Sequence, residues 1–329
     1  MAATIERLYS RSENLFSPER QAGDICVMKF GGTSVSSADA ILQVAYIVES
    51  YRRDGKQIIV VPSALADVTD ELYGICDAVG LNQRERAAEI LNNIREKHSM
   101  VCDGLEMPPI CRLDVRDSLT FLFDEIQEGI DTITEVTPEV RDWIASYGER
   151  ASIKLVGAQL GQFMLVETVE SSTIIQTDDH FERANPDFEE TEKNIDEKIT
   201  PLVKRGITPI ISGFSGATKD GRTTTLGRNS SDYSAAVIAR LSGARKLYIW
   251  KDVDGVYNDD PRLTSDVVTL SELTFEDLLG IPGGNKVINP KVIDVLGDTD
   301  VSVHVKNTFN PDHPGTRILR NHLSCRTAV

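Results

Sequence analysis

The stretch that decides the fold is Ile25-Cys26-Val27-Met28-Lys29-Phe30-Gly31-Gly32-Thr33-Ser34. Its first four residues form an apolar run typical of a buried strand, and the paired glycines allow the backbone to turn sharply after it. Residues 36–39 (Ser-Ser-Ala-Asp) are typical of a helix start, and apolar residues then recur at helical spacing as far as Tyr51. A second apolar run at residues 57–61 predicts another buried strand. For such a strand–helix–strand unit a right-handed parallel crossover is strongly favoured.

The rest of the chain repeats this alternation. We expect further strands at residues 173–175, 207–211, 247–250 and 301–305. We expect helices at about 85–105, 119–130, 138–160, 231–241, 274–280 and 286–296. Strands separated by helical segments predict an α/β fold with a mostly parallel central sheet and helices on both faces. A Gly/Thr-rich stretch from Gly216 to Gly227 lies between two strand–helix units and predicts a boundary between two lobes.

Composition and charge exclude several classes of protein. The 329 residues are 40% hydrophobic and 26% charged, and 51 acidic against 35 basic residues give a net charge of −16. Such an acidic surface makes nucleic acid and anionic membranes poor partners. No apolar run approaches the ~20 residues of a membrane span. The five cysteines are too scattered for a disulfide framework or a zinc site, and charge stands where a signal peptide would be apolar, so we expect a cytoplasmic protein.

The segment Lys29–Ser34 carries the first chemical signal. Its glycines bring backbone N–H groups towards an anion, and a lysine at the end of the strand adds a full positive charge. The pattern is neither a P-loop nor a dinucleotide fingerprint. We interpret it as a phosphate-binding turn, with a plain turn closed by two glycines as the alternative.

Two more segments carry chemistry after predicted strands. In residues 221–232, Arg228 is suited to bind a carboxylate in bidentate fashion, whereas Asp232 either caps the following helix or holds lysines in place. Residues 250–262 run from a strand end into an acidic turn, where ligands bind in open α/β sheets, although a solvated loop would have the same pattern. The histidines form no ligand-like spacing and no triad.

Taken in order, these segments resemble the aspartokinases of the amino acid kinase superfamily. The resemblance covers about residues 25–318. It rests on the following segments, in chain order: Lys29–Ser34, Ser63-Ala64 with Thr69, Tyr147-Gly148-Glu149, Gly213-Phe214, residues 223–232, residues 252–262, Asn285-Lys286-Val287 with Pro290, Lys306-Asn307-Thr308, and Gly315-Thr316. It implies an αβα sandwich in two lobes. Residues 1–24 would be an N-terminal extension, 25–225 an amino-acid-binding lobe, 226–320 an ATP-binding lobe, and 321–329 a tail.

The resemblance also implies the activity and the site. The activity would be phosphorylation of the β-carboxylate of L-aspartate to 4-phospho-L-aspartate, with ATP and Mg²⁺, in a homodimer. The catalytic residues would be Lys29, Asp232 and Lys286. The acceptor would contact Ser63, Thr69, Glu149, Arg228 and Ser231. ATP would contact Lys29, Phe30, Gly31, Gly32, Lys251, Asp252, Tyr257, Arg262, Lys286 and Val287. No metal-ligating residue is assigned.

The chain departs from the family's pattern near the acceptor. Asn229-Ser230 stands where Gly-Gly is usual, Lys251 where threonine is usual, and Asp67 and Asp70 where glycine and asparagine are expected. The two added negative charges would weaken binding of an anionic substrate. These departures keep two further hypotheses open. One is an enzyme of this fold that phosphorylates a different amino or carboxylic acid in a specialised pathway, and the other is an inactive nucleotide-binding or regulatory subunit.

The end of the sequence carries a further expectation. Only 13 residues follow Thr316, where typical aspartokinases carry two small regulatory ACT domains. We therefore expect no ACT domain in this chain, and none of the feedback inhibition by lysine or threonine that such domains confer.

Overall fold

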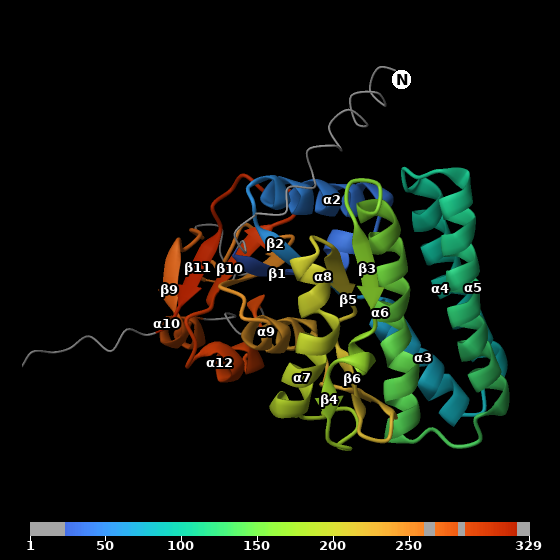
Figure 1. Cartoon of the computed structure of the whole chain (residues 1–329). Coiled ribbons are helices and arrows are strands. Elements are labelled where there is room, and N and C mark those ends of the chain that lie inside the picture. Colours follow the sequence, from blue (N-terminus) through green and yellow to red (C-terminus); the bar gives the residue numbers. More distant parts are fainter. Residues whose placement is uncertain (1–23, 260–266, 282–286, 321–329) are drawn as a thin grey trace, which may run out of the picture.

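A computed structural model describes residues 24–259, 267–281 and 287–320 (Figure 1). Its centre is an eight-stranded sheet in the order β3-β5-β2-β1-β8-β10-β11-β9. The strands are β1 (Ile25–Phe30), β2 (Gln57–Pro62), β3 (Val166–Val169), β5 (Thr208–Ile211), β8 (Lys246–Lys251), β9 (Glu272–Thr274), β10 (Ser302–Asn307) and β11 (Thr316–Leu319). All pairings are parallel except that of β10 with β11. The predicted α/β fold with a mostly parallel sheet is therefore confirmed.

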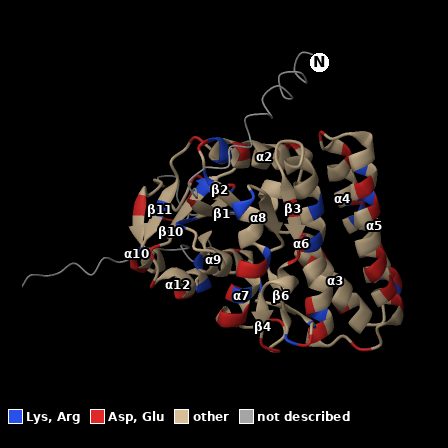
Figure 2. Ribbon diagram, in the orientation of Figure 1, with Lys and Arg blue, Asp and Glu red and all other residues tan. Residues whose placement is uncertain are grey.

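Helices cover both faces of the sheet because successive residues of each strand point to opposite sides. Met28 and Phe30 pack into one apolar core with α2 (Ala38–Arg53), α3 (Val68–Gly80), α4 (Arg84–Gly104), α5 (Pro109–Thr132) and α6 (Pro138–Leu160). Val27 and Ile249 pack into the other, with α7 (Phe188–Lys198), α8 (Thr200–Lys204), α9 (Ser231–Leu241), α10 (Phe275–Gly280) and α12 (Lys291–Leu296). Acidic residues, red in the ribbon of Figure 2, recur along α5 and α7.

The strand expected at residues 173–175 is wrong. A 3-10 helix occupies Ser171–Thr173, and the backbone N–H groups of Ile174 and Ile175 both bond the carbonyl of Ser171, at 3.0 and 2.7 Å. Both isoleucines are fully buried in this turn. Burial, not strand structure, accounts for the apolar run, and the strand itself follows as the two-residue β4 (Gln176–Thr177).

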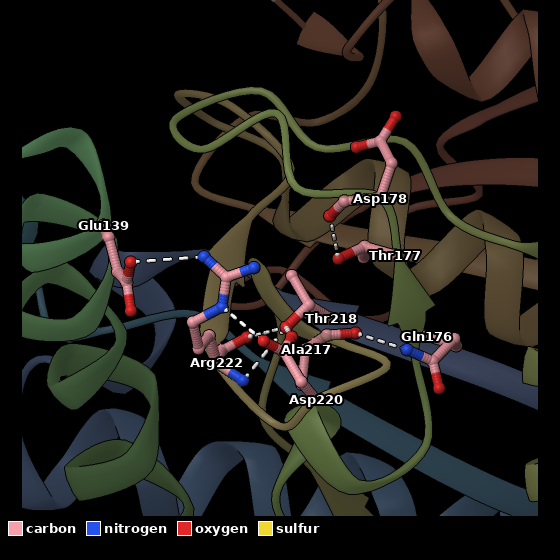
Figure 3. A network of polar contacts seen from close by, with 8 residues as sticks. All are labelled: Glu139, Gln176, Thr177, Asp178, Ala217, Thr218, Asp220 and Arg222. Atoms are coloured by element: carbon pink, nitrogen blue, oxygen red, sulfur yellow. Dashed lines mark hydrogen bonds and ion pairs between the residues drawn. The ribbon is translucent and has the colours of Figure 1, made fainter.

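The Gly/Thr-rich stretch forms two strands of a second, small sheet. Strands β6 (Ser215–Thr218) and β7 (Thr223–Thr225) pair antiparallel, and β4 joins β6 in parallel. Arg222, in the turn between β6 and β7, bonds Asp220 at 2.8 Å and reaches Glu139 of α6 at 3.3 Å (Figure 3). These contacts tie the small sheet to the helical layer. The division into lobes at residues 225 and 226 stays a prediction.

Most of the expected elements are present. The unit β1–α2–β2 has the expected parallel pairing, and α4, α6, α9 and α10 begin and end within a residue or so of their predicted bounds. The short strands β3, β6, β7, β9 and β11 and the helices α3, α7 and α8 were not expected. The helix predicted at 286–296 is too long at its start: α12 begins at Lys291, because residues 288–290 are described and are not helical. Within those ranges, no helix combines the length and apolar character needed to span a membrane.

Stacked aromatic rings stabilise the middle of the sheet. Trp250 of β8 is fully buried and lies opposite Phe30 of β1, with ring centroids 5.9 Å apart and an interplanar angle of 12°. Tyr51 of α2 packs edge-on against Trp250 at 6.2 Å. The contact joins two strands from distant parts of the chain directly beneath their carboxyl ends.

Replacing Trp250 by alanine is expected to lower the free energy of unfolding by about 3–5 kcal/mol, because a fully buried ring would leave a cavity. Trp250→Phe is expected to cost much less. It keeps a ring against Phe30 and removes an indole N–H for which no partner is found among the described residues. Urea denaturation measures both changes, and an alanine variant that loses less than about 1 kcal/mol would contradict the role of this stack.

Candidate active site

The ends of three neighbouring parallel strands define the site. Lys29 lies near the end of β1, Lys251 ends β8, and Ser63 directly follows β2. In the sheet, β1 lies between β2, the next strand in the chain, and β8, which comes much later in the chain. The strand order therefore changes direction between β1 and β8. Ligands in open α/β sheets bind at such a switch in strand order, outside the carboxyl ends of the strands.

A cleft of about 1010 Å³ opens at this edge of the sheet. It is lined by most of the residues predicted from the sequence: Lys29, Gly31, Gly32, Ser63, Thr69, Glu149, Arg228, Ser231, Asp232, Lys251 and Asp252. Its walls approach closely at Gly32, where an added Cβ would lie 3.0 Å from the carbonyl oxygen of Ala64. The sequence therefore identified residues that the fold brings together from β1, β2, α3, α6, α9 and β8.

Some predicted residues lie elsewhere. The side chain of Phe30 is buried in the aromatic stack, so only its backbone is available to a ligand. Tyr257 is half-buried and forms an isolated bridge with Thr269, and Val287 packs against the core that contains α9. None of the three lines the cleft. The predictions for Arg262 and Lys286 fall outside the described residues.

A buried carboxylate between two lysines is the centre of the cleft. Asp232, in the first turn of α9, lies 2.7 Å from Lys29 Nζ and 3.7 Å from Lys251 Nζ, and the backbone N–H of Asn289 donates to it at 3.4 Å. Burial alone would raise the pKa of Asp232, but the two lysines outweigh it and hold this pKa below its usual value. Burial lowers the pKa of Lys251, against the attraction of Asp232.

The position of Asp232 decides between the two interpretations of its sequence. The N-cap of α9 is Ser230, and no side chain caps the helix there. The Asp232 carboxylate instead contacts the two lysines. Asp232 therefore pairs with lysines from two different strands and does not cap its own helix.

A second buried acid lies in the middle of α6. Glu149 is 2% exposed, and Ser231 Oγ donates to its Oε1 at 3.4 Å. Its Oε2 has no hydrogen-bond partner in the part of the chain that the structure describes. Burial raises the pKa of Glu149 to about 7, against a backbone hydrogen bond from the Ala64 segment. A buried acid with an unused oxygen at a cleft wall is suited to bind a cationic group.

Arg228 lies at the open end of the cleft. Its side chain is 66% exposed, lies over the ring of Tyr73 at 4.7 Å, and pairs with Asp70 of α3 at 3.3 Å. Sequence reasoning missed Tyr73, although it follows Thr69 by four residues and so shares a face of α3 with it. It also missed Asn289, whose side chain bonds the carbonyl of Asn229 at 3.1 Å.

Glu149→Gln is expected to stabilise the protein at high pH. Because the pKa of Glu149 rises from 4.5 to about 7 on folding, the folded state binds the proton more tightly, and stability falls as pH rises from 4.5 through 7. Glutamine keeps the shape without the charge. The gain in unfolding free energy should reach up to about 3 kcal/mol at pH 8.5 and vanish near pH 4.5.

Urea denaturation at pH 5 and pH 8.5 measures this difference. Glu96→Gln, the same change at an exposed position of α4, is the matched control and should show no such pH dependence. If the two pH values give the same gain for Glu149→Gln, its carboxyl does not titrate as described.

Comparison with known proteins places this cleft in a family. Residues 24–307 match the model of the amino acid kinase family. An aspartokinase from Chlamydia trachomatis is 34% identical over 301 residues, which cover 91% of this chain and 65% of that protein.

Two crystal structures of Escherichia coli aspartokinase III share the fold. The complex with lysine and aspartate has a TM-score of 0.82 at 30% identity, over 91% of this chain and 66% of the other. The complex with aspartate and ADP has a TM-score of 0.78 at 28% identity, over 92% and 66%. The chain thus spans just under two thirds of the length of these proteins. Because the family model matches residues 24–307, well over half of the sequence, the chain belongs to the amino acid kinase family.

Proposed function

We propose that the chain catalyses ATP-dependent phosphorylation of the β-carboxylate of L-aspartate, giving 4-phospho-L-aspartate. The observation that carries the proposal is the pairing of the buried Lys29 and the partly buried Lys251 with Asp232, next to the buried acid Glu149 in the same cleft. The cations suit a phosphoryl group and the acid suits an amino acid's ammonium. Relatives named aspartokinases, and a structural neighbour solved with aspartate and ADP, support the same reaction.

The proposed reaction needs no general base. A β-carboxylate with a reference pKa near 3.9 is ionised at neutral pH. Its oxygen attacks the γ-phosphorus of ATP, a new O–P bond forms, and the bond from the γ-phosphorus to the bridging oxygen breaks as ADP leaves. The protein must align the reactants and neutralise the charge of the transferring group. Lys29, Lys251 and Lys286 would supply that charge, and Asp232 would position the lysines.

The acceptor would lie between the strand ends and α3. In this proposal Glu149 binds its ammonium group and Arg228 its α-carboxylate. Ser63, Thr69 and Ser231 contact the remaining polar atoms. Glu149 is buried, and its pKa near 7 makes the ionised form available at neutral and higher pH. Acceptor binding should therefore strengthen as pH rises through 7.

The nucleotide would lie towards β8. The backbone of Phe30, Gly31 and Gly32, with Lys251 and Asp252, would contact its phosphates and sugar. Tyr257, Arg262, Lys286 and Val287 remain proposed contacts on the resemblance alone. When bound, Mg²⁺ neutralises charge on the phosphates, and it commonly uses one or two carboxylates together with phosphate oxygens. Asp252, an exposed carboxylate at the cleft, fits such a contact.

The proposal has three wider features. The amino acid would bind the lobe of residues 25–225 and ATP that of residues 226–320. The protein would act as a homodimer, which sedimentation velocity can test. A cytoplasmic location fits the free thiols of the four described cysteines, because disulfides form mainly in oxidising compartments.

A second function has one observation in its favour. Asp70 pairs with Arg228, the residue proposed to bind the α-carboxylate of aspartate. An acceptor without that group, or with another in its place, would compete less with Asp70. A different amino or carboxylic acid is therefore the alternative substrate.

Trapping the acyl phosphate with hydroxylamine tests the proposal. The assay contains ATP, Mg²⁺ and one of L-aspartate, L-glutamate, N-acetyl-L-glutamate or β-alanine. Hydroxamate with L-aspartate in excess over the others is the expected result. Signal with another acid alone would replace aspartate by that acid. Silence with every acid, with ATP still bound, would favour an inactive nucleotide-binding subunit.

Lys29→Ala is expected to lower kcat by ~100-fold or more, the usual loss when one charge-stabilising donor is removed. Lys246→Ala is the matched control, because Lys246 lies at the amino end of β8, at the other end of the strand from Lys251. The control should keep its rate within about twofold. A Lys29→Ala enzyme that retains more than about a tenth of the wild-type rate would show that Lys29 does not stabilise the transferring group.

A further inference from the structure

We propose that Asp70 competes with the acceptor's α-carboxylate for Arg228, and so sets how strongly the enzyme prefers acceptors that carry this group. The inference rests on the proposed function, because it takes Arg228 as the acceptor's carboxylate site. It adds a residue that determines specificity and that the family resemblance does not assign. Asp70 would act through Arg228 and not on the reacting atoms.

The geometry brings the two residues together from distant parts of the chain. Arg228 Nη1 lies 3.3 Å from Asp70 Oδ1 across 158 positions of sequence, and both residues line the cleft. The guanidinium also lies over the ring of Tyr73, one turn further along α3. Tyr73 can keep the guanidinium in place while one carboxylate leaves it and another arrives.

The chemistry of the pair is that of an internal substitute for the ligand. The Asp70 side chain carries the same carboxylate group as the α-carbon of an amino acid. An acceptor with an α-carboxylate must therefore displace Asp70 before it can pair with Arg228. Both side chains are largely exposed, at 66% and 76%, so the pair is weak and exchange is possible. Competition from Asp70 reduces the affinity for an acceptor with an α-carboxylate severalfold without abolishing binding.

The competition makes a specific prediction about two acceptors. β-Alanine is aspartate without its α-carboxylate, so it does not compete with Asp70 for Arg228. It keeps the ammonium that Glu149 would bind and the carboxylate that would be phosphorylated. Asp70 should therefore penalise L-aspartate and leave β-alanine nearly unaffected. The ratio of their kcat/KM values measures the effect of Asp70 directly.

A purely structural role for Asp70 gives a different result. Asp70 lies in the first turn of α3, where a negative charge interacts favourably with the helix dipole. If this were its only role, Asp70→Asn would lower the thermal midpoint and leave the acceptor ratio unchanged. The acceptor ratio therefore separates the two roles, because a change in stability alone does not move it.

Asp67 supplies the matched control. It lies at the N-cap of α3, is exposed and lines the same cleft, but no ion pair of Asp67 is found within the described ranges. Its φ of 68° is one that asparagine also adopts readily. Asp67→Asn thus removes an equal charge from the same helix end without touching the contact to Arg228.

The experiment compares wild type, Asp70→Asn and Asp67→Asn with L-aspartate and β-alanine. For Asp70→Asn we expect kcat/KM with L-aspartate to rise about three- to fivefold, mainly through KM, the range typical of exposed ion pairs. With β-alanine we expect less than a twofold change. The gain should shrink between 50 and 500 mM salt, because exposed charges are screened. Asp67→Asn should move the ratio by less than twofold.

Several outcomes would overturn the inference. An unchanged ratio in Asp70→Asn would do so, as would an equal rise with both acceptors or an equal effect of Asp67→Asn. If no variant phosphorylates any acid, the proposed function fails instead. The inference then stands or falls on calorimetric titration, which needs no phosphoryl transfer. It predicts tighter binding of L-aspartate, but not of β-alanine, to Asp70→Asn.

Discussion

The charge of Asp232 is the interaction on which the rest of the site depends. Removing one partner from a buried ion pair leaves an uncompensated charge, which costs several kcal/mol. Here a single carboxylate compensates two lysines, one from β1 and one from β8. Without it, Lys29 and Lys251 would repel each other in a poorly solvated cleft. With it, the three groups keep one net positive charge, fixed in position before any anion arrives.

The sheet explains how the positions of Lys29, Lys251 and Asp232 are held. The strands on one side of β1 all precede residue 226, and those on the other side, from β8 to β9, all follow it. The two halves meet where β1 pairs with β8, and the Phe30–Trp250 stack fills the layer beneath that seam. Because α9 packs over β1 and β8, it brings Asp232 to the same place. The position of the charges thus follows from the packing of the core.

Local sequence patterns predicted the parts of this arrangement that depend on local signals. The apolar run before Lys29 and the helical spacing after Ser37 suffice for β1 and α2, and a strand end marks Lys251. The same kind of pattern failed at Ile174 and Ile175, since an apolar run records burial and not backbone shape. It also gave no sign of β6 and β7 in the Gly/Thr-rich stretch, where side chains of α6 contact Arg222 and Thr225.

Asp142 shows the kind of contact that local patterns cannot predict. This buried residue of α6 accepts hydrogen bonds from the backbone N–H groups of Thr225 and Glu182, at 2.8 and 2.7 Å. It thereby fixes the chain just before Leu226 and Arg228. Burial raises the pKa of Asp142 to about 6, against these bonds. Nothing near residue 142 in the sequence indicates a partner more than 80 positions away, and Arg228 and Asp70 are separated by still more, 158 positions.

The proposed acceptor site has a buried end at Glu149 and an exposed end at Arg228. This difference in burial determines how strictly each end distinguishes one acceptor from another. Glu149 is enclosed, so a charge that binds it interacts in a medium of low effective dielectric, where mismatches are costly. Arg228 is exposed, so its interactions are weak and screened by salt. Recognition of the ammonium should therefore be strict, whereas recognition of the α-carboxylate can be adjusted by a single neighbouring charge. Variation in acceptor preference within this fold is then easiest at the exposed end, where a substitution leaves Lys29, Lys251 and Asp232 undisturbed.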